Sequence, residues 1–207
     1  MSINPNSHNK YVLMTGAPGS KWSGVARSIY WSKDVDHTDY TEERTYSLNG
    51  PGHTGAYWDP GMEFQTYNWD DPFSGKGVRI IKSHTFAHQL DHLKDPGYHN
   101  KIPSYPIIMV YRNDYECMKW WLEAGGFDIT YPNYKPYYKD EENMWKQIQL
   151  QNADIMKFIW KNKDRVIETL DNYHTADLVG ISRYGIEEGF NYKTKDTKVY
   201  VYRPKIS

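Results

Sequence analysis

The sequence predicts an α/β protein of three layers (α/β/α), with a central, mostly parallel sheet between helices. Three short apolar runs carry this prediction: residues 11–15, 78–82 and 106–111. Runs that are apolar throughout, without alternation, are typical of strands buried on both faces. Because each run leads into a segment with helical spacing, we expect parallel strands joined by crossover helices. The length of 207 residues fits one domain, residues 1–207.

Helical patterns follow all three predicted strands. Residues 22–31, 86–93 and 114–126 each carry apolar side chains at helical spacing. The last of these segments ends in Gly125 and Gly126, and glycine commonly terminates helices. Each predicted strand therefore has its own crossover helix.

The clearest helix pattern begins in the second half of the chain. We expect Asp140 to cap its N-terminus, and Lys161 and Lys163 lie at its far end, where they favour the helix dipole. Its predicted inward face consists of Met144, Ile148, Ile155 and Ile159. Apolar and polar residues then alternate over residues 198–203, which predicts a late strand.

Two segments lack a regular period. Residues 32–77 are rich in glycine, proline and aromatic residues, and a bare loop of that length is unusual inside a compact domain. We interpret them as an irregular insertion or a lid. Residues 131–138, YPNYKPYY, predict a loop. This loop and residues 57–69 suit a bound sugar or phenolic ring, and they suit equally well a cover over a sparse core.

Composition argues against several classes of function. The net charge is −1, so no overall field favours nucleic acid or an anionic membrane. Cys117 is the only cysteine, which precludes an internal disulfide. The sequence has neither an apolar run of about 18 residues nor a signal-peptide core at its start. We therefore expect a cytoplasmic protein without a nucleic-acid or membrane partner; the sequence gives no signal of its oligomeric state.

The turn after the first predicted strand, GAPGSKWSG at residues 16–24, combines glycines with a lysine and two serines. Backbone N–H groups in such a turn, at the start of a helix, form an anion site. The spacing does not match the Walker pattern G-x-x-x-x-G-K-[ST], so a plain turn is the alternative. We interpret it as a phosphate cradle of another kind, because it lies at the strand end where ligands bind such sheets. Its candidate cofactor-binding residues are Gly16, Pro18, Gly19, Ser20, Lys21, Trp22, Ser23 and Gly24.

Charged or titratable residues follow the other two predicted strands. Lys82, Ser83 and His84 follow the second strand. A histidine there can act as a general base, and a lysine can neutralise charge on an oxygen atom. The alternative is a helix start capped by Ser83 or Thr85 beside an exposed histidine. Arg112 follows the third strand, where its guanidinium offers a fork of donors to phosphate or forms a surface ion pair with Glu116.

The order of these three pieces resembles that in sulfotransferases that use 3′-phosphoadenosine 5′-phosphosulfate. In that family the first loop reads roughly P-K-S-G-T-T-W or P-R-S-G-T-T, and the second strand ends in K-T/S-H. The third strand ends in V-x-R-N-P-x-D-x-x-x-S. The resemblance covers roughly residues 11–125. The matching residues are Pro18, Ser20, Ser23, Lys82, Ser83, His84, Val110, Arg112 and Asn113, with Glu116 in place of the family's aspartate.

The sequence departs from the family pattern in several places. Lys21 and Gly19 stand in each other's expected positions, and Asp114 replaces the proline after R-N. Trp120 falls where the family has a serine that helps to bind the 3′-phosphate. The family's C-terminal glycine-rich motif has one faint counterpart, which contains Arg183. Trp120 and Arg183 are therefore further candidates for cofactor binding.

The resemblance implies a fold of the P-loop-containing nucleotide hydrolase kind and a transferase that needs no metal. His84 would deprotonate a hydroxyl or an amine of a small-molecule or sugar acceptor. Lys21 or Lys82 would stabilise the leaving phosphate oxygen, and Arg112 would hold the 3′-phosphate of the cofactor. Trp22 would stack on adenine or belong to the core.

Three other functions remain open at this point. A small-molecule kinase would use the same loop, but it needs a magnesium-binding carboxylate at a strand end, where this sequence has basic or neutral residues. A non-catalytic nucleotide-binding module would explain the departures from the family pattern. A metal site on all three of His84, His88 and His92 would need strong tilt, because residues eight apart on a helix are about 12 Å apart. His88 and His92 alone could share a metal with Asp91 or Asp95, but a solvated helix face is the simpler account, so we predict no metal.

Overall fold

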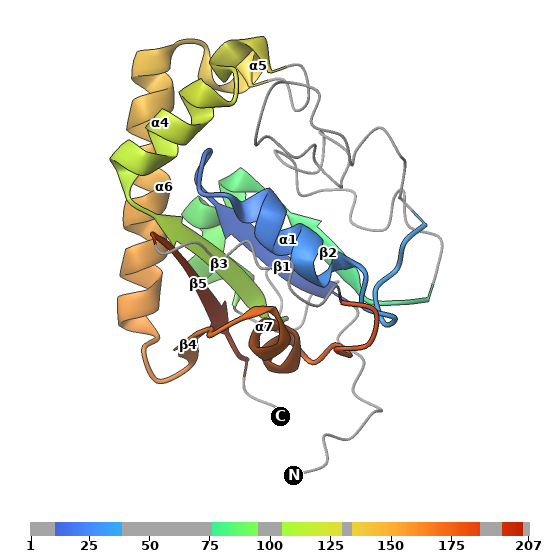
Figure 1. Cartoon of the computed structure of the whole chain (residues 1–207). Helices are drawn as coiled ribbons and strands as arrows, with labels where there is room; N and C mark the ends of the chain where they lie inside the picture. Colours follow the sequence, from blue (N-terminus) through green and yellow to red (C-terminus); the bar gives the residue numbers. More distant parts are fainter. Residues whose placement is uncertain (1–10, 39–75, 95–104, 130–133, 187–195, 205–207) are drawn as a thin grey trace.

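The computed structural model describes residues 11–38, 76–94, 105–129, 134–186 and 196–204. Within these ranges the chain is an α/β protein with a five-stranded sheet in the order β2-β1-β3-β5-β4 (Figure 1). The strands are β1 (Tyr11–Gly16), β2 (Arg79–Lys82), β3 (Ile107–Arg112), β4 (Val166–Glu168) and β5 (Thr197–Tyr202). The strands predicted from the three apolar runs are all confirmed, with ends that differ by one residue.

The sheet is mixed rather than mostly parallel. β1 pairs in parallel with β2 on one side and β3 on the other. β5 pairs antiparallel with both β3 and β4, so the prediction fails for this half of the sheet. The burial of the strands reflects this difference: β5 alternates at its start between buried and exposed side chains, whereas every residue of β1 is buried. Such alternation is typical of antiparallel strands.

Helices pack on both sides of the sheet. α1 (Trp22–Tyr30) and α7 (Asn172–Val179) contact each other and lie in front of the strands in Figure 1. The 3₁₀ helix η2 (His84–Gln89) and the short α3 (Leu90–Leu93) lie behind them, and α6 (Glu141–Lys161) packs against both and against β1 and β3. α4 (Asp114–Glu123) packs against α6.

The predicted helices are confirmed, one of them in a different form, and one predicted loop is helical. Residues 86–93 form 3₁₀ and α-helical turns that begin at His84, where the prediction had one helix. Residues 135–138, predicted as loop, form the short helix α5 (Lys135–Tyr138). Besides these, the sequence analysis missed β4, α7 and the short 3₁₀ helix η3 (Gly126–Asp128). All of them are short, so their periodicity is weak.

The long helix α6 follows its prediction closely. The Asp140 carboxylate accepts a hydrogen bond of 2.8 Å from the amide of Asn143, which satisfies one of the free donors at the helix start. Its inward face is buried at Met144 and Ile148, in a smaller cluster with side chains of α4 and α5, and at Ile155, in the main core, against which Ile159 packs partly buried. Burial of this face, more than helix propensity, accounts for the stability of the helix.

The predicted insertion or lid at residues 32–77 lies mostly outside the described residues, as do residues 57–69. Of this stretch the structure describes residues 32–38 and 76–77. Val35 forms an isolated parallel bridge with Val78, the residue directly before β2. In the described ranges no helix combines the length and the hydrophobicity that crossing a membrane requires.

Candidate functional site

The carboxyl ends of β1, β2 and β3 lie together, as predicted. In the parallel register Gly16 of β1 aligns with Val110 of β3. The amide of Ser83, just after β2, donates a 3.0 Å hydrogen bond to the Met14 carbonyl of β1. The three candidate segments, residues 16–24, residues 82–84 and Arg112, therefore meet at one edge of the sheet.

The first loop turns tightly into α1. The amide of Ser20 donates a 3.0 Å hydrogen bond to the Ala17 carbonyl, and two residues have left-handed backbones, Gly19 (φ +77°) and Lys21 (φ +65°). The Lys21 carbonyl then accepts hydrogen bonds from the amides of Gly24 and Val25. The amides of Lys21, Trp22 and Ser23 form no hydrogen bond with any described residue. Open amides at the start of a helix attract anions.

The side chain of Ser20 lies inside this turn. It is fully buried, and among the described residues its hydroxyl has no hydrogen-bond partner. A Cβ atom placed on Gly16 would come within 2.7 Å of the Ser20 hydroxyl oxygen, so Gly16 leaves the space that this side chain fills. The turn therefore holds a buried polar group together with its open amides, an arrangement that plain β-to-α turns do not need.

Position 19 of the first loop has room only for glycine. A Cβ atom at position 19 would lie 1.9 Å from the Cys117 carbonyl oxygen of α4. A lysine at this position would overlap the backbone of α4, whereas the left-handed backbone does not distinguish positions 19 and 21, because Lys21 adopts it too. The lysine is instead two positions later, at the N-cap of α1.

Lys21 reaches the outer side of the loop. Its Nζ lies 4.5 Å from the centroid of the Trp120 indole, a cation–π contact. Partial burial lowers the pKa of Lys21, and the nearby Arg112 guanidinium lowers it further. The candidate residue Trp120 thus contacts the lysine of the first loop through its ring. In the sulfotransferase pattern this position is a serine.

Lys82 lies beneath the loop and is fully buried. Its Nζ donates a 3.1 Å hydrogen bond to the Ser23 hydroxyl and lies 4.1 Å from the centroid of the Trp22 ring. The first turn of α1 therefore sits directly over this ammonium group. Trp22 is itself buried, which favours its core role over stacking on adenine.

His84 is also fully buried, so the alternative of an exposed histidine is excluded. Its ring stacks on Trp22 with the centroids 4.0 Å apart, and its Nδ1 lies 2.6 Å from the Gly16 carbonyl oxygen. Because a carbonyl only accepts, Nδ1 carries the proton and the lone pair of the neutral ring is on Nε2. Burial lowers the pKa of His84 to about 3, opposed by the bond to Gly16 and aided by the charge of Lys82.

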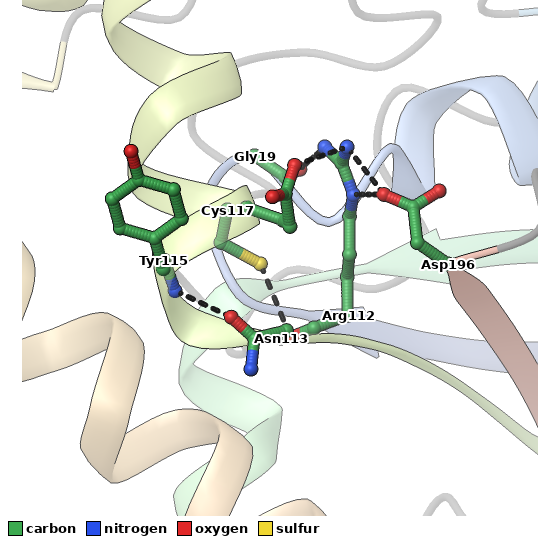
Figure 2. A network of polar contacts seen from close by, with 7 residues as sticks. Gly19, Arg112, Asn113, Tyr115, Cys117 and Asp196 are labelled. Carbon is green, nitrogen blue, oxygen red and sulfur yellow. Dashed lines mark hydrogen bonds and ion pairs between the residues drawn. The ribbon is translucent and has the colours of Figure 1, made fainter.

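Arg112 is buried, and three groups of the protein surround its guanidinium (Figure 2). Nε donates to the Asp196 carboxylate at 2.7 Å, and Nη2 lies 2.6 Å from the same oxygen. Nη1 donates to the Gly19 carbonyl at 3.2 Å, and Nη2 lies 3.5 Å from the Glu116 carboxylate. The ion pair with Glu116 considered from the sequence exists, but it belongs to a cluster around the buried Arg112 that ties the first loop to β3 and to the start of β5.

Arg183 lies apart from the other candidates. It is exposed and pairs with Asp177 of α7. The neighbouring Ser182 is hydrogen-bonded to Ser32 and Asp34, which follow the C-terminus of α1. Because the loop is at the N-terminus of α1, the whole helix separates Arg183 from Lys21.

Two observations on the described residues concern the rival sites. No group of three or more metal-ligating side chains occurs among them, and His88 pairs with Asp154 of α6 at 2.7 Å. The carboxylates beside the first loop, Glu116 and Asp196, both contact Arg112. Sequence reasoning missed Asp196, because it follows no motif and enters the site only through the antiparallel pairing of β5 with β3.

We compared the chain with models of protein families, with curated proteins and with solved structures, and none of them matched it.

The approach of Gly19 to α4 predicts a large loss of stability in Gly19→Ala. Gly126→Ala is the matched control, because Gly126 also has a positive φ (+55°) but a Cβ there would make ordinary contacts at 3.7 Å. Both variants place a side chain on a left-handed backbone, which costs about 1–2 kcal/mol. Overlap with Cys117 should add about 1–3 kcal/mol to the loss in Gly19→Ala. Urea unfolding measures both, and equal losses would contradict the steric explanation.

The buried neutral state of His84 predicts a pH dependence of stability. The pKa is about 3 in the folded protein and about 6.5 in the unfolded chain, so between these values the unfolded chain binds more protons. The free energy of unfolding should therefore fall as the pH drops below about 6.5, by up to about 1.4 kcal/mol per pH unit from this residue. Urea unfolding of the wild type and His84→Gln between pH 4 and 8 checks this. Parallel curves for the two proteins would disprove it.

Proposed function

We propose that the protein is a sulfotransferase that transfers a sulfuryl group from 3′-phosphoadenosine 5′-phosphosulfate to a hydroxyl or amine of a small molecule or sugar. The proposal includes the P-loop-like, three-layer fold of that family. One observation carries it: open amides of the first loop, the buried Lys82 and the oriented His84 converge at a single edge of the sheet. The open amides suit a bound phosphate, the ammonium group of Lys82 suits the leaving oxygen, and His84 suits removal of the acceptor proton.

The first loop would hold the 5′-phosphosulfate. The open amides of Lys21, Trp22 and Ser23 provide donors without any rearrangement of the backbone, and the buried Ser20 hydroxyl would add another. Gly16, Pro18, Gly19 and Gly24 would shape the turn. Of the two lysines, Lys82 fits the leaving oxygen better, because it already binds Ser23 beneath the helix start, whereas Lys21 extends over Trp120.

His84 would act as the general base. The acceptor oxygen would attack sulfur, the bond from sulfur to the 5′-phosphate oxygen would break, and its electron pair would stay on that phosphate. The acceptor proton would pass to Nε2 of His84. The low pKa of His84 keeps this lone pair available throughout the neutral range but makes the base weak. The proton would therefore leave late, once the new bond to sulfur has made it acidic.

A non-catalytic nucleotide-binding module of the same fold is the second candidate. Two observations favour it: His84 is completely shielded from solvent, and Arg112 is engaged by Asp196, Glu116 and Gly19. Such a module would bind the nucleotide through the loop and transfer nothing. A small-molecule kinase is the weaker alternative, and magnesium-dependent turnover of ATP would revive it.

The proposed cofactor predicts selective binding of 3′-phosphoadenosine 5′-phosphate. Isothermal titration calorimetry should give an affinity at least about tenfold higher than for AMP, because the extra phosphate gains charge-assisted hydrogen bonds. Arg183→Gln is the control, since Arg183 lies beyond the far end of α1 and its loss should leave the affinity unchanged. Equal affinities for the two nucleotides would remove the cofactor from the proposal.

The proposed base predicts a kinetic separation in His84→Ala. Sulfuryl transfer to an accepted substrate should slow by about 10²–10⁴, while the affinity for 3′-phosphoadenosine 5′-phosphate should stay close to that of the wild type. His88→Ala is the matched control, because His88 is on the same helix η2 but pairs with Asp154 away from the loop. Full activity of His84→Ala would exclude His84 as the base. If the wild type binds the nucleotide but shows no turnover, the non-catalytic nucleotide-binding module is favoured.

A further inference from the structure

A carboxylate of the chain itself occupies the edge of Arg112 that a phosphate would use. The Nε and Nη2 atoms of a guanidinium form the fork that binds carboxylates and phosphates. In this structure both atoms meet the same oxygen of Asp196, at 2.7 and 2.6 Å (Figure 2). Any phosphate that takes this fork must therefore displace Asp196.

The position of Asp196 places it on the solvent side of the guanidinium. The side chain of Arg112 is 7% exposed, whereas that of Asp196 is 39% exposed. Asp196 directly precedes β5, whose first residue, Thr197, aligns with Arg112 in the antiparallel register. The pairing of the strands keeps the carboxylate next to its partner, so its local concentration at the fork is high.

The other contacts of Arg112 leave it in place when Asp196 moves away. Nη1 still donates to the Gly19 carbonyl, which fixes the guanidinium against the first loop. Glu116 approaches Nη2 only at 3.5 Å and is the weaker of the two carboxylates. Release of Asp196 would leave a buried, oriented cation whose Nε is open and whose Nη2 meets only Glu116. Its bond to Gly19 keeps this cation against the loop that carries the open amides of Lys21 and Ser23.

We propose that Asp196 is a tethered competitor for anions at Arg112 and sets the affinity of this site for a phosphate group. A single phosphate displaces it only at high, saturating concentration, whereas a ligand that is also held by the first loop displaces it at a lower concentration. Asp196 thereby selects for molecules that carry two separated anionic groups. The identity of the displacing group as a 3′-phosphate rests on the proposed function, but competition at the fork of Arg112 does not.

Asp196→Asn tests this inference. The amide keeps the size of the side chain and one acceptor for Nε, but it removes the charge that competes with phosphate. Calorimetry on the full chain should show binding at least about tenfold tighter than in the wild type, both for inorganic phosphate and for 3′-phosphoadenosine 5′-phosphate. Asp177→Asn is the matched control, because it makes the same charge change in another aspartate–arginine pair, at Arg183, and should gain nothing.

The outcomes separate this inference from the proposed function. If Asp196→Asn gains affinity for inorganic phosphate but neither protein prefers the 3′-phosphorylated nucleotide, the competitor role stands and the sulfotransferase proposal fails. If the wild type binds that nucleotide and Asp196→Asn binds both anions no more tightly, the competitor role is overturned. Absence of any anion binding in both proteins also overturns it. The gain must disappear in the double variant with Arg112→Gln.

A second measurement covers the case in which Asp196→Asn does not fold. In the wild type, the Nε–H resonance of Arg112 can be followed by NMR after assignment with Arg112→Lys. Saturating inorganic phosphate should shift this resonance, because Nε changes its partner from Asp196 to the phosphate. A resonance that stays in place overturns the inference.

Discussion

Burial of Lys82 and His84 at the end of β2 is the constraint on which the described site depends. Both side chains are completely shielded from water, and a buried polar or charged group is costly unless it has partners. The first loop supplies those partners through the Gly16 carbonyl, the Ser23 hydroxyl and the Trp22 ring. The conformation of the loop is thus coupled to the neighbouring strand, and a change in either must alter the other.

Arg112 fixes the same loop from the opposite side. Its contacts reach Gly19 in the loop, Glu116 on α4 and Asp196 before β5 (Figure 2). The close approach of Gly19 to the backbone of α4 leaves no room for a side chain there. The loop is therefore held between β2 and α4, and its amides stay open because these contacts use carbonyl groups and side chains. This preorganisation suits anion binding, whatever the anion is.

The sequence allowed a good prediction of the strands and the long helices. β1, β2 and β3 were readable because strands buried on both faces must be apolar throughout, and α6 was readable from its cap and its inward face. The direction of β5 was missed even though its alternation was seen, because a pattern of burial does not name the neighbouring strand. β4, α5 and α7 were missed because a segment of three to eight residues holds too little periodicity.

The candidate site, like the fold, was only partly predictable from the sequence. The sequence by itself determined that a glycine loop, Lys82 with His84, and Arg112 follow three strands, since order along the chain and strand ends can be read from apolar runs. Only the tertiary structure decided which of these groups are buried and what they contact. It brought Trp120 to Lys21, separated Arg183 by the length of α1, and placed Asp196 on Arg112. The reason is physical: these contacts join residues far apart in sequence, and the packing of the sheet and helices alone sets their distances.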